Sequence, residues 1–378
     1  MLKILFISHD ASLTGGSILL LNLIKLLNES GIYESTVLLR KGGPMEPDFA
    51  KVARTFTWDQ PGVPETAKRK KIIRRLRNRF MGDDEQNSEI LEEVRKTDVI
   101  INNTITNGEL LETVLKDFSG KVFSYIHELE MASVRFATPR GIKLTLELSD
   151  KLLVPSDAVK HHLNSRYAID LKKIVSLSYY IPTKVMDKNE VQHKTRNELI
   201  VGGCGTLDWR KGVDIFIGVA RRLLSMDLLQ YFVFTWKGAN INSSEYAQCL
   251  YHIEKAGLSN RITLISADCE MDSFYNDIDI FFLSSREDPY PLVVLEAASY
   301  GKPIICFENA GGAPEFVKED AGSTVPYLDI SAVVTSLLEY KNNPEMVLEK
   351  GQKAKCRVQE MHQTKSAILQ QFDQIVNN

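Results

Sequence analysis

Two acidic side chains with a fixed spacing are the first candidates for chemistry. Asp288, with Glu287 beside it, lies in the loop after a predicted buried strand at residues 278–283, and Glu296 lies eight positions after Asp288 in the following helix. Ligands of open parallel sheets bind beyond the carboxyl ends of the strands, where this loop is expected. The two carboxylates can accept hydrogen bonds from hydroxyl groups of one extended ligand, which favours a polyol. Taken alone, such a pair would more often be a solvated loop and helix face.

Cationic and glycine-containing loops follow other predicted strands in the same half of the chain. Arg210 and Lys211 lie in the loop that begins at Gly205, and Gly311 and Gly312 follow the strand after the acidic helix. Glycines let backbone amides approach a ligand, and amides at a helix N-terminus favour an anion. Fixed cations and amides together would stabilise negative charge on a ligand. Each feature by itself would also fit an ordinary turn or a surface Arg-Lys pair.

Hydrophobic runs in the sequence indicate the strands and helices that could position these residues. Short runs rich in Val, Ile, Leu and Phe alternate with longer amphipathic stretches, which is typical of buried parallel strands joined by helices. We expect two such series, with strands at 3–8, 35–39, 98–102, 121–126, 151–155 and 173–180, and then at 199–205, 232–236, 262–266, 278–283 and 303–307. The polar stretch 181–197 separates the two series.

The predicted fold is therefore α/β, with two Rossmann-like doubly wound parallel-sheet domains. We place an N-terminal domain at residues 1–182 and a C-terminal domain at 183–360. Residues 361–378 are expected to form an amphipathic helix that crosses back to the N-terminal domain. A chain of 378 residues is long enough for two domains.

Composition excludes several classes of protein. Apolar residues make up 44% of the chain and charged residues 25%, as in soluble globular proteins, and a net charge of -3 argues against a nucleic-acid binder. The five cysteines show no metal-binding or disulfide spacing, which favours a reducing cytosol. The first apolar run is too short for a signal peptide or a membrane span. We expect a cytoplasmic protein.

The acidic motif resembles that of a known family, the retaining glycosyltransferases with the GT-B architecture, in particular glycosyltransferase family 4. Its members carry two acidic residues separated by seven, a Leu-Glu-Ala helix and a Gly-x-Pro-Ile strand, as residues 288–305 do here. The resemblance implies that the first acid, Asp288 or Glu287, contacts hydroxyls of the donor sugar. It also implies that Glu296 contacts the ribose of the nucleotide, with Leu292 beside it in the nucleotide site.

Further matches follow in the order in which the family has them. The loop that begins at Gly205 and ends in Lys-Gly-Val-Asp, starting at Lys211, is similar to the family's cationic loop, with Arg210 as the second cation. The Gly311-Gly312 turn looks like the family's phosphate loop.

In the N-terminal half, Gly15 and Gly16 resemble the loop that faces the donor phosphates across a cleft between the domains. His127 matches a histidine near the reacting sugar, where it would donate or accept a hydrogen bond and bind no metal.

The resemblance implies a metal-independent hexosyltransferase that takes its sugar from a nucleotide-diphosphate donor and uses no other cofactor. Its acceptor would be a glycan or a lipid-linked molecule, in polysaccharide or glycoconjugate biosynthesis. A sugar-nucleotide epimerase of the same fold and a non-catalytic binding subunit are the alternatives. Because the motifs do not fix the base, the sugar or the acceptor, these stay open.

A basic segment runs from Lys68 to Phe80, with eight cations in thirteen residues. Apolar residues at helical spacing within it would suit the inner surface of an anionic membrane. A charged helix that caps the domain is an equally good interpretation.

Overall fold

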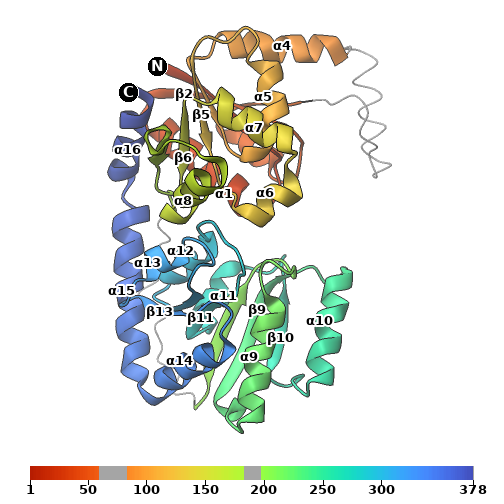
Figure 1. Cartoon of the computed structure of the whole chain (residues 1–378), viewed down its shortest axis with the longest axis vertical. Helices are drawn as coiled ribbons and strands as arrows, with labels where there is room; N and C mark the ends of the chain where they lie inside the picture. Colours follow the sequence, from red (N-terminus) through yellow and green to blue (C-terminus); the bar gives the residue numbers. More distant parts are fainter. Residues whose placement is uncertain (59–82, 183–196, 378) are drawn as a thin grey trace. The chain divides into compact units, whose positions relative to one another are not determined.

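The computed structural model describes residues 1–58, 83–182 and 197–377. It consists of two compact units (Figure 1). The N-terminal unit comprises Met1–Pro155, Lys160–Tyr180 and Lys365–Asn378, and the C-terminal unit comprises Ser156–Val159 and Ile181–Thr364. The basic segment from Lys68 to Phe80 and most of the polar stretch 181–197 lie outside the described residues, so their predicted roles stay predictions.

The N-terminal unit is built on a seven-stranded sheet with the order β3-β2-β1-β4-β5-β6-β7. All its strand pairs are parallel. The strands are β1 (Leu2–Ser8), β2 (Tyr33–Leu39), β3 (Arg54–Thr57), β4 (Val99–Asn102), β5 (Lys121–Tyr125), β6 (Lys151–Val154) and β7 (Ile174–Ser176). The helices are α1 (Gly15–Ser30), α2 (Glu46–Val52), α4 (Asp83–Arg95), α5 (Gly108–Val114), α6 (Glu130–Phe136), α7 (Pro139–Leu148), α8 (Asp157–Tyr167) and α16 (Lys365–Asn377), with short 3-10 turns at Ile105–Asn107 and Leu171–Lys173.

The C-terminal unit has a six-stranded parallel sheet with the order β10-β9-β8-β11-β12-β13. Its strands are β8 (Leu199–Cys204), β9 (Phe232–Ala239), β10 (Ile262–Ser266), β11 (Ile280–Leu283), β12 (Ile304–Phe307) and β13 (Gly322–Val325). Its helices are α9 (Val213–Ser225), α10 (Ser244–Lys255), α11 (Met271–Asp277), α12 (Leu292–Ser299), α13 (Ala313–Val317), α14 (Ile330–Asn342) and α15 (Pro344–His362), with a 3-10 turn at Leu229–Tyr231.

The two sheets confirm the predicted α/β fold with two Rossmann-like domains. Central strands such as β1 and β11 are apolar along most of their length because both faces of a parallel sheet are covered by helices. In each unit the first strand, β1 or β8, has a neighbour on either side, so the strand order reverses there. Doubly wound sheets place their ligands beyond the carboxyl ends of the strands at this point.

Two strands were not predicted, and both lie at an edge of a sheet. The strand β3 reads Arg-Thr-Phe-Thr and β13 reads Gly-Ser-Thr-Val, so neither contains the apolar run that identified the other strands. An edge strand has one strand neighbour, and polar residues are tolerated there. The run predicted at 173–180 was also too long, because only Ile174–Ser176 pairs with β6.

An aromatic cluster holds α9 against the C-terminal sheet. The ring of Phe216 meets Phe234 and Trp236 edge to face, with centroids 5.2 Å apart in each case, and it stacks on Phe282 at 6.1 Å. All four side chains are buried. Since α9 begins directly after the cationic loop, this packing fixes where that loop ends.

The last helix, α16, belongs to the N-terminal unit. Its Ile368 packs with Leu26 of α1 and Tyr180, and Phe372 meets the ring of Tyr33 edge to face at 5.4 Å. An ion pair of 2.5 Å joins Lys365 to Glu29 on α1. Within the described residues, no helix combines the length and the apolar character that crossing a bilayer requires.

We expect Ile368→Ala to destabilise the N-terminal unit. The side chain is fully buried, so truncation removes apolar contacts and leaves a cavity that typically costs about 2 to 5 kcal/mol. Chemical denaturation should show the loss, whereas Gln370→Ala, an exposed position on the same helix, should change the free energy of unfolding by less than about 0.5 kcal/mol. Equal stabilities of the two variants would contradict the packing of α16.

Candidate functional site

The loops after β8 and β11 meet at the carboxyl edge of the C-terminal sheet. These strands are neighbours at the reversal of the strand order. The amide of Arg286 donates to the carbonyl of Arg210 at 2.8 Å, and the hydroxyl of Ser284 donates to the carbonyl of Lys211 at 3.0 Å. The structure therefore places the predicted cationic loop against the predicted acidic loop.

Four of the predicted site residues come together in this contact. Nζ of Lys211 lies 2.5 Å from Oδ2 of Asp288, and Nη1 of Arg210 lies 3.8 Å from the same oxygen. Arg210 also donates to the backbone carbonyl of Glu287 at 2.9 Å. Asp288 is buried, with 6% of its surface exposed, while Glu287 is half-buried. Of the two adjacent acids, Asp288 is thus the one that lies against the cations.

Backbone geometry explains the glycines at the two ends of the cationic loop. Gly205 and Gly212 have φ angles of +146° and +71°, in the region that favours glycine. A Cβ on Gly212 would overlap the carbonyl oxygen of Ser284, so the loops could not approach each other as they do. The carbonyl of Gly205 accepts a hydrogen bond of 2.8 Å from the indole of Trp236.

An arginine that the sequence analysis did not single out braces the cationic loop. Arg286 forms a double hydrogen bond with Asp214 on α9, at 2.9 and 2.7 Å, and donates to the carbonyl of Trp209 at 2.6 Å. The hydrogen bond from Arg286 lowers the pKa of Asp214. In the sequence, Arg286 is one charge in a charged loop, and nothing there indicates a partner more than seventy positions away.

The Gly311-Gly312 turn, which follows β12, packs on the backbone of the acidic loop. The amide of Asp288 donates to the carbonyl of Ala310 at 2.7 Å, and the amide of Gly312 donates to the carbonyls of Asp288 and Pro289 at 3.2 and 3.1 Å. Gly311 has a φ of +129°, and a Cβ there would overlap the carbonyl oxygen of Asp288. The two glycines are therefore required by the contact between loops, and the Gly312 amide is engaged within the protein.

Glu296 and Leu292 lie one helical turn apart on α12, so they share a face of the helix. Both are half-buried. The hydroxyl of Tyr275, on α11, donates to Oε2 of Glu296 at 2.8 Å, and burial followed by the charge of Glu296 raises the pKa of Tyr275 well above its usual value. Tyr275 was not predicted because it belongs to a helix without any recognisable motif.

In the N-terminal unit, His127 is held by partners at both ring nitrogens. Nε2 lies 2.9 Å from Oδ1 of Asn103, and Nδ1 lies 2.9 Å from the hydroxyl of Tyr179. The amide nitrogen of Asn103 donates to the carbonyl of Gly16, so its oxygen is the acceptor and the proton of His127 is assigned to Nε2. Burial lowers the pKa of His127 to about 3, with a smaller contribution from His9.

Gly15 and Gly16 were predicted in a loop, but they form the first turn of α1. A Cβ on Gly15 would contact nothing within 4 Å, and one on Gly16 would touch the ring of His9 at 4.0 Å. Neither position needs glycine for packing. The phosphate contact predicted for this turn stays a prediction.

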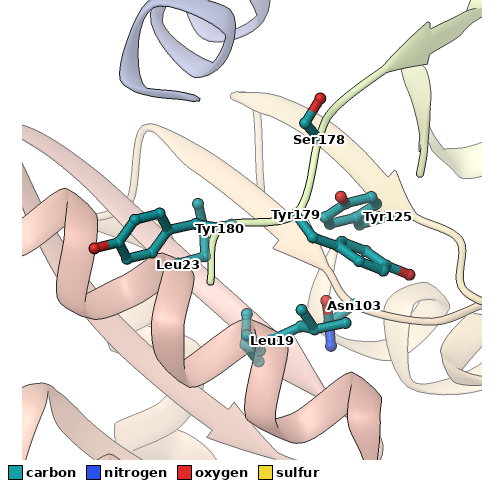
Figure 2. A pocket seen from close by; sticks show the side chains of 8 residues that line it. Leu19, Leu23, Asn103, Tyr125, Ser178, Tyr179 and Tyr180 are labelled. Carbon is teal, nitrogen blue, oxygen red and sulfur yellow. The ribbon is translucent and has the colours of Figure 1, made fainter. Parts of the chain in front are cut away.

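A small hollow of about 10 Å³ lies beside the His127 network. Leucines of α1 form one wall of this hollow. The rest of the lining consists of Asn103, Tyr125 and the segment Ser178, Tyr179, Tyr180. Figure 2 shows the rings of Tyr125 and Tyr179 side by side above Asn103. The hydroxyl of Tyr125 donates to the carbonyl of Leu177 at 2.6 Å, which fixes this ring in the wall.

Part of the sequence is similar to one protein family and to several individual proteins. Residues 185–357 match the model of the family described as glycosyl transferases group 1, which is slightly under half of the chain. Relatives include an uncharacterised glycosyltransferase of Haemophilus influenzae, 25% identical over 58% of this chain and 60% of that protein. The amylovoran biosynthesis glycosyltransferase AmsD of Erwinia amylovora is 23% identical over 43% of this chain and 53% of AmsD. The matched part thus spans between half and two thirds of these relatives.

Two solved structures have a fold similar to that of this protein over its whole length. Anabaena Alr3699/HepE in complex with UDP and glucose has a TM-score of 0.78 at 15% identity, with 100% of both chains covered. Sucrose-phosphate synthase from Thermosynechococcus elongatus has a TM-score of 0.77 at 18% identity, covering 100% of this chain and 98% of that one. At these identities the likeness shows the fold, which is the GT-B architecture of two Rossmann-like domains.

His127 is expected to stay neutral between pH 8 and pH 5. Its folded pKa lies below the ordinary value near 6.5, so the unfolded state takes up a proton first, and stability is lost as pH falls below about 6.5. Nitrogen-15 NMR of the imidazole should show a neutral ring with the proton on Nε2. Tyr179→Phe removes the hydroxyl that donates to Nδ1 and should raise the pKa of His127. Titration of the wild-type ring near pH 6.5 would contradict the network.

Proposed function

We propose that this protein is a retaining, metal-independent glycosyltransferase of family 4. It transfers a hexose from a nucleotide-diphosphate sugar to a glycan or lipid-linked acceptor in polysaccharide or glycoconjugate biosynthesis. The observation that carries the proposal is the meeting of Arg210, Lys211 and the acidic loop at the carboxyl edge of β8 and β11.

The cations match the charge that develops in such a reaction. When the bond between the sugar and the diphosphate breaks, negative charge accumulates on the leaving group. Arg210 and Lys211 lie in a loop whose backbone is fixed by Gly212 and by Arg286, so both cations are held close to the place where this charge develops. In this proposal the two side chains do the work for which other enzymes use a divalent cation.

The acids and the histidine have roles around the same leaving group. In the proposal, Glu287 or Asp288 accepts hydrogen bonds from hydroxyls of the donor sugar, and Glu296, oriented by Tyr275, accepts hydrogen bonds from the ribose. In the proposal, His127 exchanges one of its two ring partners, Asn103 or Tyr179, for a hydroxyl of the sugar, and because its folded pKa is low it does so as a neutral group rather than as a general acid.

The reaction proceeds on one face of the sugar. The acceptor hydroxyl attacks the anomeric carbon from the side that the diphosphate leaves, so a bond between that carbon and the acceptor oxygen replaces the bond to the phosphate oxygen. The proton of the acceptor passes to a phosphate oxygen of the leaving group. No protein nucleophile takes part.

Several relatives motivate the biological setting. AmsD is named for amylovoran biosynthesis, and LpcC of Rhizobium leguminosarum is named as a lipopolysaccharide core biosynthesis mannosyltransferase. We propose that this protein works in the cytoplasm on a comparable glycan, with the segment from Lys68 to Phe80 as a contact to the inner face of the membrane.

Lys211→Ala should weaken donor binding at least about tenfold, because a charge-assisted hydrogen bond to phosphate is lost. Isothermal titration with UDP, GDP and ADP identifies the preferred nucleotide on the wild type and then measures the variant. Lys255→Ala, an exposed lysine on α10, is the control and should bind as the wild type does. The proposal fails if no nucleoside diphosphate binds, or if Lys211→Ala binds as tightly as the control.

Transfer should retain the anomeric configuration and persist in excess EDTA. Proton NMR of the glycoside product reports the configuration of the new bond, and the rate with and without EDTA reports the need for a metal. An inverted product or loss of activity in EDTA would contradict the mechanism. Conversion of the donor to an epimeric sugar nucleotide in the absence of acceptor would indicate an epimerase instead.

A further inference from the structure

One carboxylate neutralises part of the positive charge at the cationic loop. Both Lys211 and Arg210 approach the same oxygen of Asp288, at 2.5 and 3.8 Å. The exposed fraction of the side chain is 8% for Asp288, 16% for Lys211 and 24% for Arg210. The cations are therefore more accessible to a dissolved anion than the carboxylate is.

The backbone of Asp288 is fixed and its side chain is short, whereas the ammonium group of Lys211 can move. Asp288 is tied to Ala310 and Gly312 by backbone hydrogen bonds of 2.7 and 3.2 Å, and its neighbour in this short parallel bridge is Gly311. Lys211 carries its charge on a flexible four-carbon stem. When an anion binds, the ammonium of Lys211 can turn toward it while Asp288 stays in place.

A bare anion must compete with Asp288 for Lys211. Drawing the ammonium away leaves a nearly inaccessible carboxylate without its partner, and a buried charge that loses its partner is strongly destabilising. Hydroxyl groups offset this cost because they donate hydrogen bonds to the carboxylate. A sugar diphosphate brings phosphate and hydroxyls together, but inorganic pyrophosphate brings phosphate alone.

We propose that Asp288 is an internal counter-ion that makes the Arg210/Lys211 site select sugar-bearing diphosphates over bare inorganic anions. The inference rests on the proposed function, since it concerns the same diphosphate site. It gives Asp288 a role in specificity that is separate from stabilising the reacting sugar.

Titration with inorganic pyrophosphate tests the inference. Asp288→Asn removes the competing charge and preserves the shape of the side chain, so it should bind pyrophosphate about tenfold more tightly than the wild type. The nucleotide sugar preferred by the wild type should gain clearly less, because the variant also replaces the charged, two-oxygen acceptor of the sugar hydroxyls by an amide with a single neutral acceptor. The ratio of the two affinities, which a purely structural role of Asp288 would not alter, is the quantity to compare.

Matched variants control for charge and folding. Glu287→Gln removes the same charge one position away and should change pyrophosphate affinity by less than about threefold, since that side chain is half-buried and is not the one paired with Lys211. Asp288→Glu keeps the charge and should keep the weak binding of pyrophosphate. If thermal unfolding shows that Asp288→Asn is not folded, Asp288→Ser takes its place. Serine also removes the charge, and its side chain is smaller.

The outcomes separate this inference from the proposed function. If Lys211→Ala weakens nucleotide binding but Asp288→Asn binds pyrophosphate no better than the wild type, the counter-ion role is wrong and the diphosphate site stands. If Lys211→Ala has no effect on nucleotide or pyrophosphate, the diphosphate site itself is wrong, and this inference falls with it.

Discussion

The contact between Asp288 and Lys211 is the constraint around which the C-terminal site is built. A carboxylate with 6% of its surface exposed needs a partner of opposite charge, and Lys211 at 2.5 Å is that partner. The pair joins the loop after β8 to the loop after β11 at the reversal of the strand order. Any ligand that uses Lys211 must therefore act on both loops at once.

Close approach of three backbone segments makes this contact possible. Gly212 lies against the carbonyl of Ser284, and Gly311 lies against the carbonyl of Asp288, where a side chain on either glycine would overlap an oxygen. In addition, Arg286 donates two hydrogen bonds to Asp214 and so ties the acidic loop to α9. The site is thus held by backbone geometry and a second ion pair, so the backbone of the cationic loop is in place before any ligand binds.

Local patterns in the sequence predicted most of the fold, for physical reasons that can be traced. Central strands such as β11, Ile-Phe-Phe-Leu, are apolar because both faces are covered, and they were identified by that property. The edge strands β3 and β13 are short and partly polar, so no run marked them. Gly15 was placed in a loop because glycine is uncommon in helices, but the first turn of α1 tolerates it.

The candidate site was predictable where a motif is contiguous and unpredictable where partners are distant in the chain. The sequence indicated Lys211 and Asp288 separately, and the structure adds that they form a pair. Tyr275 beside Glu296, and Tyr179 beside His127, come from elements without a motif, and only the folded chain shows these contacts.

The central claim is that Arg210 and Lys211 hold the diphosphate of the donor. A crystal structure with the preferred nucleotide sugar tests it most directly. The account predicts diphosphate oxygens within hydrogen-bonding distance of Lys211 Nζ and the Arg210 guanidinium, with a sugar hydroxyl at the carboxylate of Asp288. A diphosphate bound elsewhere, with Lys211 still paired to Asp288, would contradict it.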